Sequence, residues 1–205
     1  MIYKGYSSSW FKNVEPYDYN ILNIPSDAIK VCLVGNSRKI KGIKYFIESF
    51  DYLNTDKEVY YIVVGNKTDS EEFKNIKNKI PNGQNILLLG AKENALSLIK
   101  GADIYVQTSL NEGLGRAICE AMCLEKPIVM TNAGGCIELI DKNSGIVVPI
   151  KDSAKIGKAI STLVNNEDLR ISMGKNAKKR IDNKINIQKN AEEKYLLYKS
   201  LVNKN

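Results

Sequence analysis

The sequence predicts an α/β fold: a Rossmann-like open parallel sheet of about six strands with helices on both faces. From residue 31 onward, short apolar runs alternate with segments whose apolar residues recur at helical spacing. Most of these runs are apolar on both sides, as parallel strands covered by helices on both faces must be. Gly35, Gly65 and Gly90 each end such a run, and glycine there lets a ligand approach the carboxyl edge of the sheet.

Each element follows from its local pattern. The predicted strands are residues 31–35, 59–65, 86–90, 103–108, 127–131 and 145–148. The predicted crossover helices are residues 43–53, 71–79, 93–100, 114–124 and 154–164, and two further basic helices are expected at 168–181 and 187–202. Residues 1–30 are rich in aromatic side chains and show no sustained period, so we expect them to dock on an apolar surface, either of this domain or of a partner.

The composition excludes several classes of protein. A chain of 205 residues with 43% apolar side chains can bury a real core, which rules out a disordered chain and a disulfide-stapled miniprotein. No apolar run approaches the roughly 20 residues that span a bilayer, and the first residues form no signal-peptide core, so we expect a cytoplasmic protein. The four cysteines form no Cys-x-x-Cys pair and histidine is absent, so we expect reduced thiols and no metal site.

The missing histidine and the distribution of charge narrow the chemistry further. Without histidine, any acid–base step must use carboxylates, lysines or tyrosines. Residues 151–205 hold 13 basic against 6 acidic residues and carry the whole net charge of +7. Nucleic-acid binding through this tail is disfavoured, because it lacks a basic stretch interleaved with aromatic residues. An interdomain surface, or peripheral contact with the inner face of a membrane, stays a hypothesis.

Residues 102–122 are the most informative segment, and they read as a strand, a glycine-bearing turn and a helix. Glu112 falls in the turn, Gly113 and Gly115 open the helix, and Glu120 lies about a turn and a half into it. The N–H groups and positive dipole end of a helix N-terminus suit a diphosphate, while carboxylates accept hydrogen bonds from sugar hydroxyls. On local chemistry alone, however, a solvated loop carboxylate and a charge on a helix face are the favoured interpretation.

Two other turns carry candidate groups. The turn after residues 31–35 bears Arg38, Lys39 and Lys41, cations that either neutralise phosphate oxygens or are simply solvated. The turn at residues 131–138 contains two glycines that permit close backbone approach, and it is as well explained as a tight turn. Neither a dinucleotide-binding fingerprint nor a Walker A sequence occurs, which disfavours a dehydrogenase and a P-loop enzyme.

Taken together, the segments from about residue 28 to 180 resemble the C-terminal, donor-binding domain of group 1 (family 4) retaining glycosyltransferases of the GT-B fold. The shared motifs, in the same order, are Val34-Gly35 with Lys41-Gly42, Ile62-Val63-Val64-Gly65, Leu89-Gly90, Ala102-Asp103, Ser109, Glu112-Gly113-Leu114-Gly115, Glu120-Ala121-Met122, Lys126-Pro127-Ile128-Val129, Gly134-Gly135 with Glu138, and Gly145-Ile146-Val147-Val148. So many matches in order are more specific than any single motif, and they overturn the local interpretation of Glu112 and Glu120.

The resemblance implies roles for the matched residues. Glu112, Lys41 and Arg38 would act at the reacting group, with Glu112 on hydroxyls of the donor sugar and the two cations on the diphosphate. The other donor-binding residues that it implies are Gly35, Asn36, Ala91, Lys92, Gly113, Leu114, Gly115 and Glu120.

Within this set the roles differ. Glu120 would bind the ribose, and Ala91 and Lys92 would border the base. This chain departs from the family at Asn36, where many members have arginine, so Arg38 is the candidate to supply the guanidinium instead.

The resemblance also implies an organisation and a reaction. Residues 1–30 would be an interdomain connection and its flank, residues 31–180 the nucleotide-sugar donor-binding domain, and residues 181–205 a helix that crosses to an N-terminal acceptor-binding domain absent from the chain. We expect retaining transfer of a hexosyl group from a nucleoside diphosphate sugar to a hydroxyl acceptor, in cell-surface polysaccharide, lipopolysaccharide or glycolipid synthesis, without cofactor or metal and with the chain alone inactive. The alternative is a non-catalytic nucleotide- or sugar-binding module, or the regulatory half of a split glycosyltransferase.

Overall fold

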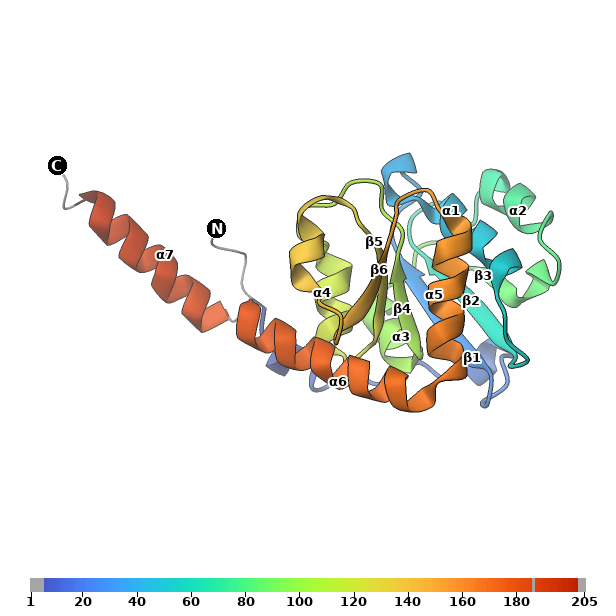
Figure 1. The fold of residues 1–205 in the computed structure, drawn as a ribbon, viewed down its shortest axis with the longest axis horizontal. Helices are drawn as coiled ribbons and strands as arrows, with labels where there is room; N and C mark the ends of the chain where they lie inside the picture. Colours follow the sequence, from blue (N-terminus) through green and yellow to red (C-terminus); the bar gives the residue numbers. More distant parts are fainter. Residues whose placement is uncertain (1–5, 186, 203–205) are drawn as a thin grey trace.

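A six-stranded parallel sheet forms the centre of the molecule, which a computed structural model describes for residues 6–185 and 187–202 (Figure 1). The strands are β1 (Ile29–Val34), β2 (Val59–Val64), β3 (Ile86–Leu88), β4 (Ile104–Gln107), β5 (Ile128–Thr131) and β6 (Gly145–Val148), in the spatial order β3-β2-β1-β4-β5-β6. All neighbouring strands run parallel. The predicted Rossmann-like fold class is therefore confirmed, and the strand order reverses beside β1, where open sheets of this kind bind ligands.

Helices cover both faces of the sheet. They are α1 (Ile43–Ser49), α2 (Glu71–Lys77), α3 (Ala95–Gly101), α4 (Arg116–Cys123), α5 (Ser153–Asn165), α6 (Glu167–Lys184) and α7 (Ile187–Val202). Helices α1, α2 and α5 pack on one face, and α3 and α4 on the other, so two separate apolar cores result. Helix α6 joins the two cores, because Met173 belongs to the first core and Ala177 and Ile181 to the second.

The predicted elements are found within a few residues of their expected bounds, and backbone geometry explains the differences. The strand expected to reach Gly90 stops at Leu88, and Gly90 itself has a positive φ of 67°, outside the extended region. The helix expected from residue 114 begins at Arg116, because Gly115, at φ 71°, is its N-cap. The basic helix expected to end at residue 181 continues to Lys184.

The aromatic N-terminal segment docks on this domain. Phe11 and Tyr19 are buried in the α3/α4 core, and the Tyr19 hydroxyl donates to the Leu98 carbonyl at 2.7 Å. The backbone of Tyr6 pairs with Ile185 and Ile187 on either side of the α6–α7 junction. Residues 1–5, part of the expected interdomain connection, lie outside the described residues.

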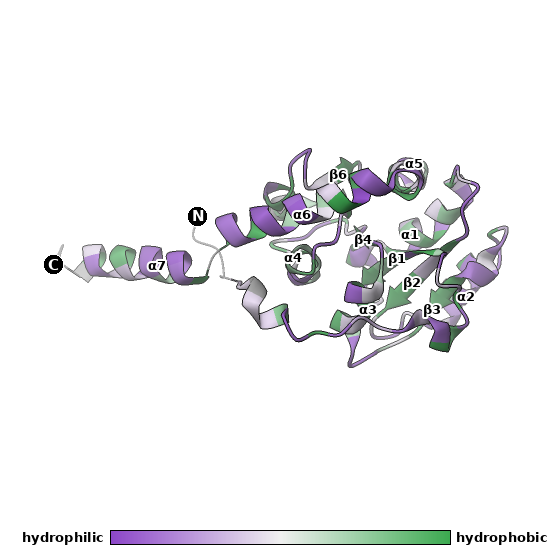
Figure 2. Ribbon diagram, turned by 90° about the horizontal axis from the view of Figure 1, so that it is seen from below, coloured by the Kyte–Doolittle hydropathy of each residue, from purple (hydrophilic) through white to green (hydrophobic). Residues whose placement is uncertain are grey.

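Helix α7 extends away from the sheet (Figures 1 and 2). Hydropathy colouring shows apolar and polar turns alternating along it, and its exposed apolar side chains include Tyr195, Leu196, Tyr198 and Leu201. Residues 203–205 lie outside the described part of the chain. Among residues 6–185 and 187–202, no helix combines the length and the apolar character needed to cross a membrane.

Candidate functional site

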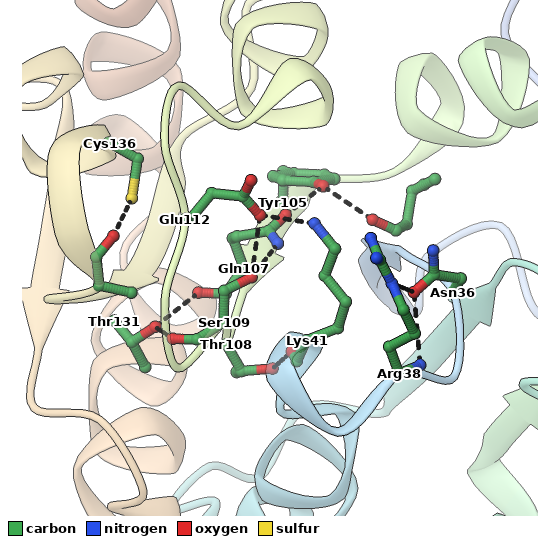
Figure 3. Close-up of polar contacts among 12 residues, drawn as sticks. Asn36, Arg38, Lys41, Tyr105, Gln107, Thr108, Ser109, Glu112, Thr131 and Cys136 are labelled. Atoms are coloured by element: carbon green, nitrogen blue, oxygen red, sulfur yellow. Dashed lines mark hydrogen bonds and ion pairs between the residues drawn. The ribbon is translucent and has the colours of Figure 1, made fainter.

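An ion pair lies at the carboxyl edge of the sheet, between the loops that follow β1 and β4 (Figure 3). Lys41 Nζ is 2.5 Å from Glu112 Oε2, and the side chains are only 20% and 16% exposed. Ser109 Oγ donates to the same carboxylate oxygen at 3.2 Å. Partial burial reduces screening by water, so this pair interacts more strongly than an exposed one. The structure thus brings together two residues that the sequence separates by 71 positions.

The β1–α1 loop delivers Lys41 because it is tied directly to the end of β4. A short 3₁₀ helix, Lys39–Lys41, ends at Gly42, which has a φ of +62°. A Cβ atom at Gly42 would stand 2.0 Å from the Thr108 carbonyl oxygen, so only glycine fits there. The Thr108 hydroxyl donates to the Gly42 carbonyl at 3.0 Å, and the Leu110 N–H donates to the Ile40 carbonyl at 2.7 Å.

The glycines of the β4–α4 loop keep its backbone accessible. Gly113 is exposed, and a Cβ added there would meet no heavy atom within 4 Å. Gly115 caps α4, whose first N–H groups therefore begin directly after this open loop. The predicted helix opening by Gly113 and Gly115 is confirmed in the sense that Gly115 is the N-cap.

The turn at residues 131–138, which the sequence also singled out, packs against this loop. A Cβ at Gly134 would approach the Glu112 carbonyl oxygen to 2.6 Å, and one at Gly135 would approach the Gly113 carbonyl oxygen to 3.0 Å. The close backbone approach that these glycines permit is therefore made by the β4–α4 loop. The Thr131 hydroxyl adds a hydrogen bond of 2.5 Å to the Ser109 carbonyl.

Asn36 and Arg38 form a second unit at the same edge (Figure 3). Asn36 Oδ1 accepts from the Arg38 backbone N–H at 3.3 Å and from Arg38 Nε at 3.2 Å. The amide of Asn36 thus holds an exposed guanidinium directly after β1. Gly35 lies beneath, so close to the end of β2 that a Cβ at Gly65 would come within 2.0 Å of the Gly35 carbonyl oxygen.

The remaining predicted site residues are not joined to the Lys41–Glu112 pair. Glu120, whose side chain is only 14% exposed, pairs instead with the exposed Arg116 of α4, at 2.9 Å. Ala91 and Lys92 are exposed in the loop after β3, and Leu114 is half-buried beside the open loop. Among residues 6–185 and 187–202 no group of three or more ligating side chains is placed to hold a metal ion.

Sequence reasoning missed the polar side chains beneath Glu112. Tyr105 and Gln107 fall within the predicted strand at residues 103–108, and the sequence singles out Ser109 only as part of the family pattern. The available signal was their spacing: polar groups at every second residue of a buried strand lie on one face of the sheet.

Fold and site together define an open α/β domain whose carboxyl edge carries cations, a carboxylate and the N-terminus of α4. The sequence profile of the glycosyl transferases group 1 matches residues 16–180, so the chain belongs to this family. An uncharacterized glycosyltransferase of Methanocaldococcus jannaschii is 31% identical over 99% of the chain and 53% of its own length. The capsular polysaccharide biosynthesis glycosyltransferase CapM of Staphylococcus aureus is 28% identical over 86% of the chain and 47% of its length. The chain spans about half the length of these curated relatives.

Solved structures share the fold. The Anabaena protein HepE in complex with UDP superposes with a TM-score of 0.86 at 20% identity, covering 97% of this chain and 57% of HepE. The C-terminal domain of the group 1 glycosyltransferase LpcC from Francisella tularensis gives a TM-score of 0.72 at 24% identity, covering 86% of this chain and 98% of that domain. The observed architecture thus matches a Rossmann-like domain of the GT-B fold.

Proposed function

We propose that this chain is the donor-binding domain of a retaining glycosyltransferase that uses a nucleoside diphosphate sugar. The observation that carries the proposal is the half-buried Lys41–Glu112 pair beside the open Gly113 loop and the N-terminus of α4. Positive charge, free backbone N–H groups and a carboxylate thereby occur within one edge of the sheet. Support also comes from HepE, whose structures contain UDP or UDP-glucose.

The proposed chemistry places negative charge where this edge can stabilise it. When the glycosidic bond to the diphosphate breaks, charge builds on the departing nucleoside diphosphate. Lys41 and Arg38 would neutralise phosphate oxygens, with Asn36 holding the guanidinium of Arg38, and the N–H groups at the start of α4 would add further donors. In the proposal, these cations neutralise the leaving diphosphate, and no metal ion takes part.

The two glutamates would bind hydroxyl groups at different ends of the donor. Glu112 would orient the sugar. Lys41 would neutralise the Glu112 carboxylate before the donor binds, and its ammonium group would then turn to a phosphate of the donor. Glu120 would accept hydrogen bonds from the ribose after exchanging its exposed partner Arg116 for a ligand. Ala91 and Lys92, after β3, would border the base, and Gly35 and Leu114 would line the diphosphate.

The acceptor side of the reaction lies outside this chain in the proposal. Group 1 relatives are about twice its length, which supports a partner domain that carries the acceptor site. Hexosyl transfer would then proceed with retention, on the face that the leaving group vacates, and the chain alone would be inactive. The described relatives include a capsular polysaccharide enzyme, which supports a role in cell-surface polysaccharide or glycolipid synthesis.

Calorimetry with UDP, UDP-glucose, UDP-galactose and GDP-mannose tests donor binding directly. Lys41→Ala and Glu120→Ala should each weaken binding of the nucleoside diphosphate by about tenfold or more, because each removes a charge-assisted hydrogen bond. Lys44→Ala is the matched control, since Lys44 is a solvent-exposed lysine of α1. Unchanged affinity in both site variants, or no binding by the parent chain, contradicts the proposal.

A second assay distinguishes the enzyme from a binding module. Adding an N-terminal half from a group 1 relative and measuring sugar transfer should restore activity if this chain is the donor half. Donor binding without transfer, in combination with several such halves, favours the alternative of a non-catalytic or regulatory module.

We also propose peripheral contact with an anionic membrane, through a basic groove at the opposite end of the sheet. The groove has a volume of about 580 Å³, and its cations are Lys12, Lys100, Lys126, Lys175 and Lys178. Lys100 and Lys126 donate to backbone carbonyls and Lys178 pairs with Glu125, whereas the ammonium groups of Lys12 and Lys175 have no partner among residues 6–185 and 187–202. These two are therefore free to meet lipid phosphates.

Liposome sedimentation tests this contact. Vesicles with anionic lipid should bind the parent chain, and Lys12→Glu with Lys175→Glu should abolish binding by charge repulsion. Lys57→Glu, an exposed lysine on another side of the domain, is the control. Equal binding to neutral and anionic vesicles rules out the proposed contact.

A further inference from the structure

Three polar side chains lie in a row under Glu112, at alternate positions of β4 and its extension: Tyr105, Gln107 and Ser109. All three are almost completely buried, with 0%, 3% and 0% of their surface exposed. Their side chains face the core formed with α3 and α4, where the neighbouring strands contribute apolar groups, among them Ile62 and Met130. Polar groups in such surroundings are costly unless each finds a hydrogen-bond partner.

Each of these side chains donates to the next, and the Tyr105 hydroxyl also lies within 3.4 Å of a second acceptor, the Val34 carbonyl. The Tyr105 hydroxyl donates to Gln107 Oε1 at 2.9 Å, and Gln107 Nε2 donates to Ser109 Oγ at 2.6 Å. Ser109 Oγ in turn donates to Glu112 Oε2 at 3.2 Å. Figure 3 shows this row from the tyrosine ring to the glutamate, with Lys41 approaching the same carboxylate. The row ends on an ionised carboxylate, a group that only accepts.

The direction of donation follows from the chemistry of each group. Burial raises the pKa of Tyr105 well above its usual value, so its hydroxyl keeps its proton and remains a donor. Gln107 has an acceptor at one end of its amide and donors at the other, and it therefore connects a donor to an acceptor. Because Gln107 occupies a lone pair of Ser109 Oγ, the serine hydroxyl is left to donate toward Glu112.

Lys41 Nζ and Ser109 Oγ both donate to Oε2 of the Glu112 carboxylate. Within the described residues, Oε1 accepts no hydrogen bond. Two donors on one oxygen hold the plane of the carboxylate, and Oε1 is left to receive a ligand hydroxyl. If the ammonium of Lys41 turns to a phosphate when the donor binds, Ser109 alone keeps this orientation.

We propose that Tyr105 and Gln107 are positioning residues which, through Ser109, fix the Glu112 carboxylate for the hydroxyls of the donor sugar. This inference rests on the proposed function and names further residues for the same site. Apolar residues at positions 105 and 107 together would suit this core, since the surrounding groups are apolar. What the hydrogen-bonded row adds is a fixed orientation of the Glu112 carboxylate.

The test compares a nucleoside diphosphate with its sugar conjugate, because only the conjugate reaches Glu112. The probes are UDP with UDP-glucose or UDP-galactose, and GDP with GDP-mannose, measured by calorimetry on the full chain. Tyr105→Phe removes one oxygen atom, and Gln107→Met removes the amide while keeping the length of the side chain. Each should weaken binding of the sugar conjugate about three- to tenfold and change binding of the free diphosphate less than twofold.

Two further variants calibrate the comparison. Glu112→Gln should produce the largest loss of preference for the sugar conjugate. Tyr61→Phe is the matched control: Tyr61 is a fully buried tyrosine of β2 on the opposite face, with its hydroxyl 3.2 Å from Ser49 Oγ. It should lower thermal stability about as much as Tyr105→Phe and leave the ratio of the two affinities unchanged.

The outcomes separate the inference from the proposed function. If Glu112→Gln lowers the ratio and both Tyr105→Phe and Gln107→Met leave it unchanged, or weaken both probes equally, the row is structural and the inference is wrong. If the parent chain binds none of the probes, or Glu112→Gln has no effect, the proposed function of this site fails first. Tyr105→Phe removes a single oxygen atom and keeps the ring, so it keeps the test decisive even if Gln107→Met unfolds.

Discussion

Two tyrosines buried in the same sheet differ in what they contact. Tyr61 of β2 lies in the core under α1, α2 and α5, stacked on Phe46 with ring centroids 4.2 Å apart and an interplanar angle of 3°. Phe50 meets the same ring edge-on at 4.9 Å. Tyr105 of β4 lies in the core under α3 and α4, and its hydroxyl begins the row that ends on Glu112.

This contrast shows that the two faces of one sheet can have different roles. The core around Tyr61 contributes packing, and it supports the candidate site through α1 and through Leu33 of β1 and Val106 of β4. The core around Tyr105 contributes packing and also carries polar groups to the carboxyl edge. All four cysteines belong to this second core, so it also contains more groups that can ionise.

Removing the stacked ring should produce the largest change in stability. Phe46 is fully buried between α1 and β2, so Phe46→Ala should lower the free energy of unfolding by roughly 3–5 kcal/mol through lost burial and a residual cavity. Urea unfolding measures this loss. Affinity for UDP, expressed per folded molecule, should stay within about twofold of the parent value.

A loss below 1 kcal/mol would mean that the core around Tyr61 relaxes to fill the space. A large loss of UDP affinity in the folded fraction would show that the two faces do not divide their work as proposed.

Alkaline pH should affect the α3/α4 core first. Burial raises the pKa of the Cys32, Cys119 and Cys123 thiols to about 12 and that of Cys136 to about 11. The folded state therefore holds these protons more tightly than the unfolded chain, whose thiols ionise near 9. The stability that they contribute is fully present below pH 9 and is lost as the pH rises toward 11 to 12.

At one pH unit above 9, each thiol should account for about 1.4 kcal/mol of lost stability. Urea unfolding under reducing conditions at pH 8 and pH 10 measures the difference, and Cys119→Ala should reduce it by about that amount. Buried tyrosines also begin to contribute near their usual pKa of about 10, so the difference between the parent chain and Cys119→Ala isolates the thiol. An unchanged difference in Cys119→Ala would show that the buried thiols do not govern the alkaline response.

The fold was largely predictable because it depends on local patterns. Two-sidedly apolar strands and helical spacing are properties of neighbouring residues, and the glycines that end strands or cap helices act over one or two positions. Even so, Gly115 moved the start of α4 by two residues, since a positive φ at the N-cap is a backbone property that hydrophobic spacing does not report.

The contacts of the site were less predictable because they connect distant positions. Nothing near Lys41 in the sequence indicates that its ammonium reaches Glu112, and the pairing depends on how Gly42 packs on Thr108. The row from Tyr105 was missed because one polar side chain in a buried strand looks like an exception. The row is recognised only when three such residues are seen to lie on the same face of the sheet.

The smallest effect is expected for Arg116 at the surface of α4. Its substitution compares a charge beside the site with the charge of Glu120 within it. Arg116 is 79% exposed and pairs with Glu120 four residues later, so Arg116→Ala should change the free energy of unfolding by less than about 0.5 kcal/mol. UDP affinity should change at most about twofold, because the ribose must in any case replace this guanidinium on Glu120. Calorimetry beside Glu120→Ala checks the contrast: equal losses in the two variants would assign the nucleotide contact to the arginine and deprive Glu120 of its proposed role.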